Sequence, residues 1–199
     1  MPYGHRGMLF MRRLKLQTQI TLDGYMGGPN GEMDWMSMSW SDDTSDYIRE
    51  IMASVDTILL GRKLAEGFIP AWESRPEGEP DESIDWMINT PKVIVSNTLT
   101  EPPRDNVTVA NGDLVESITA LKAQPGGDII AYGGGELVAS LVEAGLIDEL
   151  HLFVNPTAIG SGMPVFGKPG QYAPFTTIQT RRLDSGMLVI QLEPRREEP

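Results

Sequence analysis

The chain has 199 residues, no cysteine, two histidines and a formal net charge of -12. This length supports one substantial hydrophobic core, and the composition excludes disulfides, thiolate metal sites and a multi-histidine metal centre. The acidic charge disfavours nucleic acid and anionic membranes as partners, and no apolar run reaches the roughly 20 residues of a membrane span. The lack of cysteine fits a cytoplasmic protein.

The ends of the chain differ from its centre in composition. Residues 1–13 hold two further methionines that could serve as alternative starts, Met8 and Met11, and we expect them to form a disordered extension. Residues 194–199 are a charged tail. We therefore expect a single domain over residues 14–193.

The first predicted element is a strand followed by a long glycine-rich loop. Residues 14–22 alternate apolar and polar side chains, which is typical of a half-buried strand. Residues 23–31 carry Gly24, Gly27, Gly28 and Gly31, and such a loop is either functional or a plain surface hairpin. Trp35 ends it in a segment that we expect to be exposed.

A helix is predicted from Ser41, which suits an N-cap position. Asp42 and Asp43 stand in its first turn, where carboxylates suit the helix dipole, and Asp46 lies one turn further on. One of these acids could face a pocket. Alternatively, all three are solvated side chains that stabilise the helix end.

Residues 56–61 form a second, buried strand that breaks at Gly61 into Arg62 and Lys63. A glycine followed by two cations at a strand end suits a phosphate group, although a helix start with solvated charges gives the same pattern. Residues 69–80 are rich in proline and charge and predict a loop. Residues 81–89 suggest a short helix.

Two further strands are predicted at residues 92–96 and 106–110, and the first ends in the polar pair Ser96-Asn97. Asp113 then suits the N-cap of an amphipathic helix. A fifth strand, at residues 129–132, follows shortly after that helix.

The stretch from 128 to 148 reads as strand, glycine turn and helix. Tyr132 ends the strand, Gly133, Gly134 and Gly135 turn the chain without any Cβ, and Glu136 and Leu137 begin an amphipathic helix. Gly145 suits the C-cap position. A glycine turn that opens a helix presents free N–H groups and the positive end of the dipole, which suits a phosphate. The spacing departs from the usual dinucleotide fingerprint, so a dinucleotide would bind to another fold.

The last third of the chain changes character. Residues 147–154 form a strand, residues 156–166 a loop punctuated by glycine and proline, and residues 175–183 and 187–193 a hairpin around Asp-Ser-Gly. The alternation of strands and helices before this hairpin predicts an α/β fold with a mostly parallel sheet, helices on both faces, and an antiparallel ending.

Four strand ends carry the polar and glycine residues: Leu22-Asp23-Gly24, Gly61-Arg62-Lys63, Ser96-Asn97 and Gly-Gly-Gly-Glu-Leu at 133–137. Together with the later runs Ala-Gly-Leu-Ile-Asp-Glu-Leu and Pro-Thr-Ala-Ile-Gly-Ser-Gly-Met-Pro-Val-Phe, this order resembles the dihydrofolate reductase-like superfamily. It is most similar to the branch that holds the reductase domain of the riboflavin-synthesis deaminase-reductase. The resemblance covers roughly residues 14–193.

The resemblance implies an NADPH-dependent reductase of a pterin- or pyrimidine-like substrate, similar to 5-amino-6-(5-phosphoribosylamino)uracil reductase, and a homodimer. It implies these cofactor contacts: Thr21, Asp23, Gly24, Gly27, Gly61, Arg62, Lys63, Ser96, Asn97, Gly133, Gly134, Gly135, Glu136 and Leu137. The candidate substrate contacts are Thr18, Trp35, Asp42, Asp43 and Tyr132. Asp46 and Tyr132 are the candidate catalytic residues, and the proton could also come from water.

The chain departs from the family pattern at two places. Tyr132 stands where the riboflavin reductase usually has a substrate-contacting glutamate, and its Asp-Asp-Pro segment is absent after the second strand. No deaminase zinc motif is present. Two alternatives therefore stay open, a non-catalytic NADPH-binding module and a dimeric interaction protein without a cofactor.

Overall fold

A computed structural model describes residues 11–36, 40–166 and 173–195 of the chain. One eight-stranded sheet runs through the molecule in the order β5-β4-β3-β6-β1-β7-β10-β9. The strands are β1 (Leu14–Thr21), β2 (Tyr25–Gly27), β3 (Val55–Gly61), β4 (Lys92–Val95), β5 (Val107–Ala110), β6 (Asp128–Tyr132), β7 (Glu149–Asn155), β8 (Met163–Pro164), β9 (Phe175–Arg182) and β10 (Leu188–Pro194). The helices are α1 (Asp42–Met52), α2 (Arg62–Glu73), α3 (Asp81–Asn89), α4 (Leu114–Lys122) and α5 (Gly135–Glu143).

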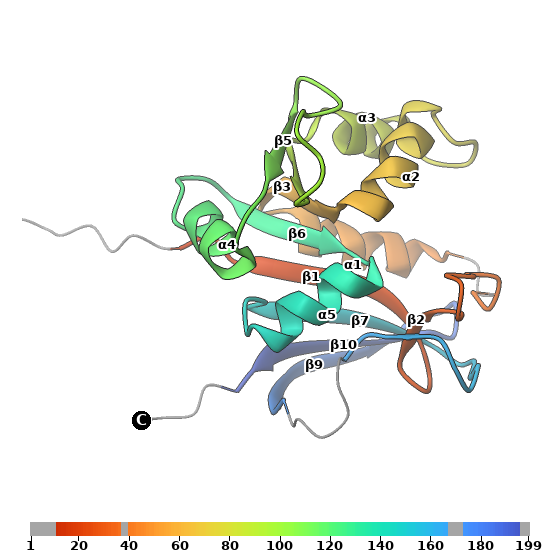
Figure 1. Cartoon of the computed structure of the whole chain (residues 1–199). Coiled ribbons are helices and arrows are strands. Elements are labelled where there is room, and N and C mark those ends of the chain that lie inside the picture. The colour runs from red at the N-terminus through yellow and green to blue at the C-terminus, as the bar shows by residue number, and fades with distance from the viewer. Residues whose placement is uncertain (1–10, 37–39, 167–172, 196–199) are drawn as a thin grey trace, which may run out of the picture.

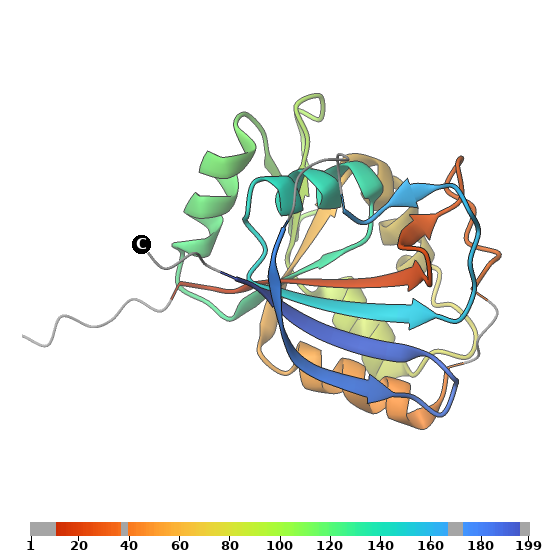
Figure 2. The same cartoon turned by 90° about the horizontal axis from the view of Figure 1, so that it is seen from below.

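The six strands from β5 to β7 are parallel, whereas β10 pairs antiparallel with both β7 and β9. Helices cover both faces, with α4 and α5 on one side and α1 on the other (Figures 1 and 2). This is the predicted mixed, mostly parallel α/β fold with an antiparallel ending, and the fold prediction is confirmed. The carboxyl ends of the parallel strands share one edge of the sheet, which we call the carboxyl edge.

Two apolar cores hold the helices to the sheet, one on each face. The first contains Leu14 and Leu16 of β1 and packs against Val138 and Leu141 of α5. The second contains Ile58, Leu60 and Ile130 and packs against Tyr47 and Ile51 of α1 and Ala65 and Ile69 of α2. Burial of apolar surface in these cores contributes roughly 25 cal/mol per Å² and determines which face of each helix packs on the strands.

The structure corrects several local predictions. Strand β1 is buried on both faces rather than half-buried, because α1 covers the side that carries its polar residues. Residues 69–73, predicted as the start of a loop, are helical, because α2 continues through Pro70 to Glu73. Pro70 cannot donate a backbone hydrogen bond, but the buried side chain of Ile69 keeps this part of the chain helical.

The ends of the domain also differ from the prediction. Arg12, placed in the predicted disordered extension, is buried, pairs with Asp56 and donates to the Gly127 carbonyl at 2.6 Å. Arg13 pairs with Glu149 at 3.0 Å. Within the described residues, no helix is both long enough and apolar enough to span a membrane.

Candidate functional site at the carboxyl edge

The glycine turn after β6 and the start of α2 lie against each other. A Cβ on Gly61 would stand 3.4 Å from Cβ of Leu137, and one on Gly134 would stand 3.6 Å from Cβ of Leu64. The Lys63 ammonium also pairs with the Glu136 carboxylate at 2.8 Å. Segments 61–63 and 133–137, more than 70 residues apart in sequence, are therefore brought together at the carboxyl edge.

The glycine turn suits the approach of a ligand to the backbone. Gly134 has a φ of +99°, which disfavours any residue with a Cβ, and it precedes the first turn of α5. A Cβ on Gly133 would meet only the Thr18 hydroxyl, at 3.8 Å. The first N–H groups of α5 have no acceptor within the helix, so the turn directs a partial positive charge outward.

The first turn of α2 adds two cations to this positive end. Gly61 is the N-cap and offers no side-chain cap, and the turn contains Arg62 and Lys63 but no acid. Cations at a helix N-terminus oppose the dipole, so this arrangement disfavours the isolated helix and favours a bound anion. In the unliganded chain, Arg62 pairs with Glu66 and Lys63 with Glu136. The hydrogen bond from Lys63 lowers the pKa of Glu136.

The loop after β1 and the segment near residue 163 form a two-stranded ribbon. The sequence predicted two separate loops there. β2 pairs antiparallel with β8, and the Val165 N–H donates to the Gly24 carbonyl at 3.1 Å. Met163 of this ribbon packs between Gly27 and Gly135, at 3.0 and 3.4 Å from their ideal Cβ positions. The glycine-rich loop after β1 therefore lies beside the glycine turn (Figure 1).

Asp23 holds this ribbon to the sheet. Its carboxylate accepts from the Thr21 hydroxyl at 2.6 Å and from the Gly160 N–H at 2.7 Å. These hydrogen bonds, the one from Thr21 first, lower the pKa of Asp23. The side chains of Thr21 and Asp23 thus shape the loop after β1. Trp35, expected to be exposed, is 7% exposed and donates its indole N–H to the Glu32 carbonyl.

Ser96 and Asn97 shape the neighbouring strand end. The Ser96 hydroxyl accepts from the N–H groups of Thr98 and Leu99, and the Asn97 side chain accepts from the Gly112 N–H at 2.9 Å. These bonds fix the chain after β4 beside the end of β5. Both residues lie at the carboxyl edge, directly after β4.

The three acids of α1 have other contacts. Asp42 is exposed, Asp46 pairs with Arg49 on the solvent side, and Asp43 accepts from the Ser41 hydroxyl and from the Asp184 N–H of the β9–β10 turn. The inner face of α1 consists of its buried residues Thr44, Tyr47 and Ile51. That inner face carries no carboxylate, so these contacts do not favour proton transfer by Asp46.

Tyr132 and Thr18 lie on opposite faces of neighbouring strands. The Tyr132 ring stacks on Phe68 at 5.5 Å, and its hydroxyl contacts Sδ of Met52 at 3.5 Å. Burial raises the pKa of Tyr132, which makes the phenol a poor proton donor. Thr18 is buried on the α5 side, next to Gly133.

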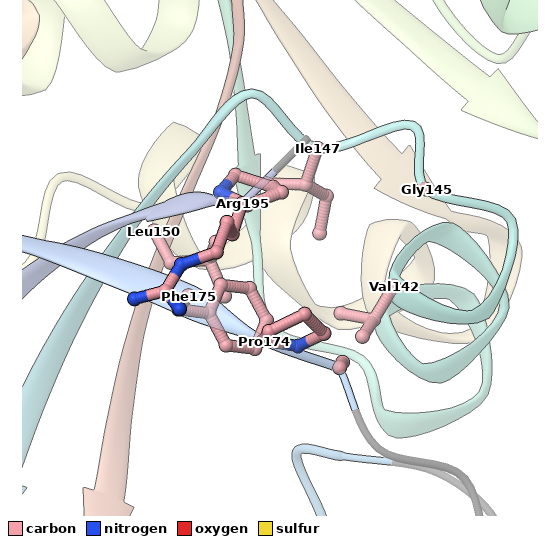
Figure 3. A pocket seen from close by; sticks show the side chains of 9 residues that line it. Val142, Gly145, Ile147, Leu150, Pro174, Phe175 and Arg195 are labelled. Atoms are coloured by element: carbon pink, nitrogen blue, oxygen red, sulfur yellow. The ribbon is translucent and has the colours of Figure 1, made fainter. Parts of the chain in front are cut away.

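The described residues form two further hollows, one away from the glycine turn and one that includes Arg62. One, of about 130 Å³, lies at the carboxyl end of α5 where β7 and β9 begin, and its lining is apolar apart from Arg195 (Figure 3). It is at the opposite edge of the sheet from the glycine turn. A second hollow, of about 210 Å³, lies between α2 and residues 99–104 and is flanked by Arg62 and Arg104. In the described part of the chain, no group of three or more acids and histidines could hold a metal.

Comparisons with known proteins agree with this fold. YyaP, an uncharacterized protein of Bacillus subtilis strain 168, is 34% identical over 187 residues, which cover 92% of this chain and 95% of YyaP. A protein ascribed to riboflavin biosynthesis in Shewanella sp. PV-4 superposes with a TM-score of 0.73 at 22% identity, covering 92% of this chain and 99% of that one.

Dihydrofolate reductase of Enterococcus faecalis, solved in a complex with NADP(H), superposes with a TM-score of 0.61 at 15% identity, covering 94% of this chain and 99% of that one. The family model of the RibD C-terminal domain matches residues 12–189, nearly the whole described fold. The chain is therefore a member of the RibD C-terminal domain family.

Proposed function

We propose that this protein is an NADPH-dependent reductase that transfers a hydride to a pterin- or pyrimidine-like heterocycle. The observation that carries the proposal is the convergence of Gly61–Lys63 with Gly133–Glu136 at the carboxyl edge. Family membership and the likeness to a reductase solved with NADP(H) support a nicotinamide cofactor. Ligands of open α/β sheets bind at this edge.

The residues present fit the diphosphate of a dinucleotide. Gly133 leaves open space that a Cβ would enter, Gly134 supplies the left-handed backbone, and the start of α5 supplies N–H donors. Arg62 and Lys63 supply the positive charge that the protein lacks overall. We propose that Ser96 and Asn97 position the adenosine end so that its 2′-phosphate, like the diphosphate, interacts with Arg62 and Lys63.

When bound, NADPH supplies the hydride, and the chain's own residues bind and orient the two reactants. We propose that Thr18 and the β2–β8 ribbon border the nicotinamide and that Tyr132 borders the substrate ring. Asp23 acts on this site by holding the ribbon in place. Because the inner face of α1 carries no carboxylate and Tyr132 is a poor acid, we propose water as the proton source.

Thermal unfolding with and without cofactor tests the proposal. A ligand present at 100 times its dissociation constant adds about 2.7 kcal/mol to the stability of the folded state. For a domain of 150–250 residues this corresponds to a rise in Tm of roughly 5–11 °C. NADPH is expected to produce this rise and NADP⁺ a similar one. A Tm that neither cofactor moves would contradict the proposal.

A second candidate, a dimeric interaction protein without a cofactor, is favoured by the pairing of both cations within the chain. Arg62 and Lys63 already have carboxylate partners, Glu66 and Glu136. These pairs are exposed, however, and exposed ion pairs contribute only about 0–1 kcal/mol. A phosphate can therefore displace them at little cost, and the unchanged Tm described above would identify this candidate.

We also propose that the protein forms a homodimer through β9. This strand is at the edge of the sheet, and six of its eight residues are exposed, including Ile178 at 49%. A free strand edge is a template for pairing with a second copy. Light scattering is expected to give twice the 21.9 kDa mass of the chain, and Ile178→Lys is expected to give the monomer. A wild-type protein whose mass stays that of the monomer as its concentration is raised would contradict the proposal.

A further inference from the structure

The first turn of α5 carries an acid at the place where the proposed diphosphate would approach. Glu136 is the second residue of this helix, directly after Gly135, and its side chain is 85% exposed. It accepts from the Lys63 ammonium at 2.8 Å, and the charge of Arg62 acts on it as well. A carboxylate repels phosphate groups, so its presence at this site needs a physical reason.

One reason is structural, because a carboxylate in the first turn of a helix interacts favourably with the helix dipole. Asp81 has the same role in the first turn of α3, where it is 87% exposed and pairs with Arg75 at 2.8 Å. Arg75 follows the carboxyl end of α2, whereas Lys63 is in its first turn, and this helix of 12 residues is about 18 Å long. Asp81 is therefore the structural equivalent of Glu136 at a distance from the cofactor site.

The two cations of the proposed site are both neutralised within the chain. Arg62 pairs with Glu66, one turn further along α2, and Lys63 pairs with Glu136. This group of four side chains thus carries two positive and two negative charges. NADPH and NADH share the diphosphate and differ by the 2′-phosphate, and a phosphate monoester carries about −1.5 to −2 charges at pH 7. An acid at this site therefore acts against NADPH more than against NADH.

The charge beside the adenosine ribose is what separates the two cofactors in other dinucleotide sites. In open α/β folds, an acid accepts from the 2′-hydroxyl of NAD, whereas an arginine accommodates the 2′-phosphate of NADP. This chain combines both kinds of group. Arg62 and Lys63 suit the phosphate, and the Glu136 carboxylate, 2.8 Å from the Lys63 ammonium, suits the hydroxyl.

We propose that Glu136 determines cofactor specificity by weakening the preference for NADPH, so that the protein also accepts NADH. A 2′-phosphate takes Lys63 from Glu136 and leaves the carboxylate beside a second negative group. NADH lacks that phosphate, so the Lys63–Glu136 pair can remain while it binds. This inference rests on the proposed function and concerns which of the two cofactors its site selects.

Fluorescence titration of NADPH and NADH tests the assignment through the ratio of their dissociation constants. The wild-type protein is expected to prefer NADPH by less than about 10-fold. Glu136→Gln should raise NADPH affinity about 3- to 10-fold and NADH affinity by a smaller factor, because an exposed charge acts weakly. Glu136→Lys should raise the preference for NADPH further. Both changes should largely disappear in 1 M salt, where the Debye length is about 3 Å.

Asp81→Asn is the matched control, because it removes an equally exposed first-turn acid and its ion pair outside the site. It is expected to lower stability about as much as Glu136→Gln and to leave both affinities unchanged. A stronger wild-type preference for NADPH, a ratio that neither Glu136 variant changes, or a change that persists in 1 M salt would overturn the inference alone. A wild-type protein that binds neither cofactor would overturn the proposed function and this inference with it.

Discussion

The double variant Arg62→Glu/Lys63→Glu is expected to lower NADPH affinity by at least 100-fold and NADH affinity by a smaller factor. A hydrogen bond to a charged group contributes about 1.5–3 kcal/mol, so the loss of two corresponds to roughly 3–6 kcal/mol. Both cations stand in the first turn of α2, beside the glycine turn. NADH lacks the 2′-phosphate, so its affinity is expected to fall by less. Fluorescence titration of both cofactors measures the two dissociation constants.

The stability of this double variant separates binding from folding. The first turn of α2 carries two cations and no acid, so new carboxylates there suit the helix dipole by about 0.3–1 kcal/mol each. Repulsion from Glu66 and Glu136, the present partners of the two cations, opposes this gain, so the free energy of unfolding is expected to stay about level. Arg49→Glu/Arg75→Glu is the matched control, because it changes the net charge equally at exposed ion pairs of α1 and of the 75–85 segment. Equal loss of NADPH and NADH would remove the 2′-phosphate assignment.

The convergence at the carboxyl edge could be predicted from the sequence because it follows from topology. Each parallel strand ends in a recognisable signal, Gly61 before two cations or Gly133 before a helix, and parallel strands end on one edge. The antiparallel hairpin was equally predictable from Asp-Ser-Gly between two strands, and β9 and β10 form it.

The features that the sequence did not predict depend on tertiary contacts. The alternation in β1 indicates one polar face, yet it cannot tell whether that face meets water or a helix, and α1 covers it. The β2–β8 ribbon was missed because its strands are three and two residues long and pair across more than 130 residues. Such contacts leave no local periodicity.

A polar network of Tyr47, Glu149, His151 and Gln191 joins α1, β7 and β10. Within it, Glu149 is expected to contribute most to stability. Its carboxylate accepts from His151 at 2.5 Å and from Gln191 at 3.0 Å, and it pairs with Arg13 at 3.0 Å. Glu149→Ala leaves the buried His151 and the half-buried Gln191 without this acceptor, whereas Arg13 is 43% exposed and keeps its pair with Glu193. We expect the free energy of unfolding to fall by about 3–5 kcal/mol. Denaturant unfolding at pH 7 measures the loss.

Glu193→Ala provides the control for that loss, because Glu193 pairs with the same Arg13 at 2.5 Å but is 39% exposed in its side chain. Its removal should cost under about 1 kcal/mol. A comparably small loss for Glu149→Ala would contradict the network's role in holding β7, β10 and α1 together.

The pH dependence of the Glu149→Ala effect gives a second, independent expectation. Burial alone would raise the pKa of Glu149, but the hydrogen bond from His151 and the charges of His151, Arg13 and Lys15 outweigh it and lower the pKa. A carboxylate with a lowered folded-state pKa stabilises the fold above its unfolded value of about 4.3, and this contribution disappears as the pH falls through the folded value. The stability difference between wild type and Glu149→Ala should therefore be constant from pH 6 to 7, roughly two units above that value, and shrink in acid. A difference that instead grows in acid would show that Glu149 is protonated in the folded protein, because a buried neutral acid has the opposite sign of linkage.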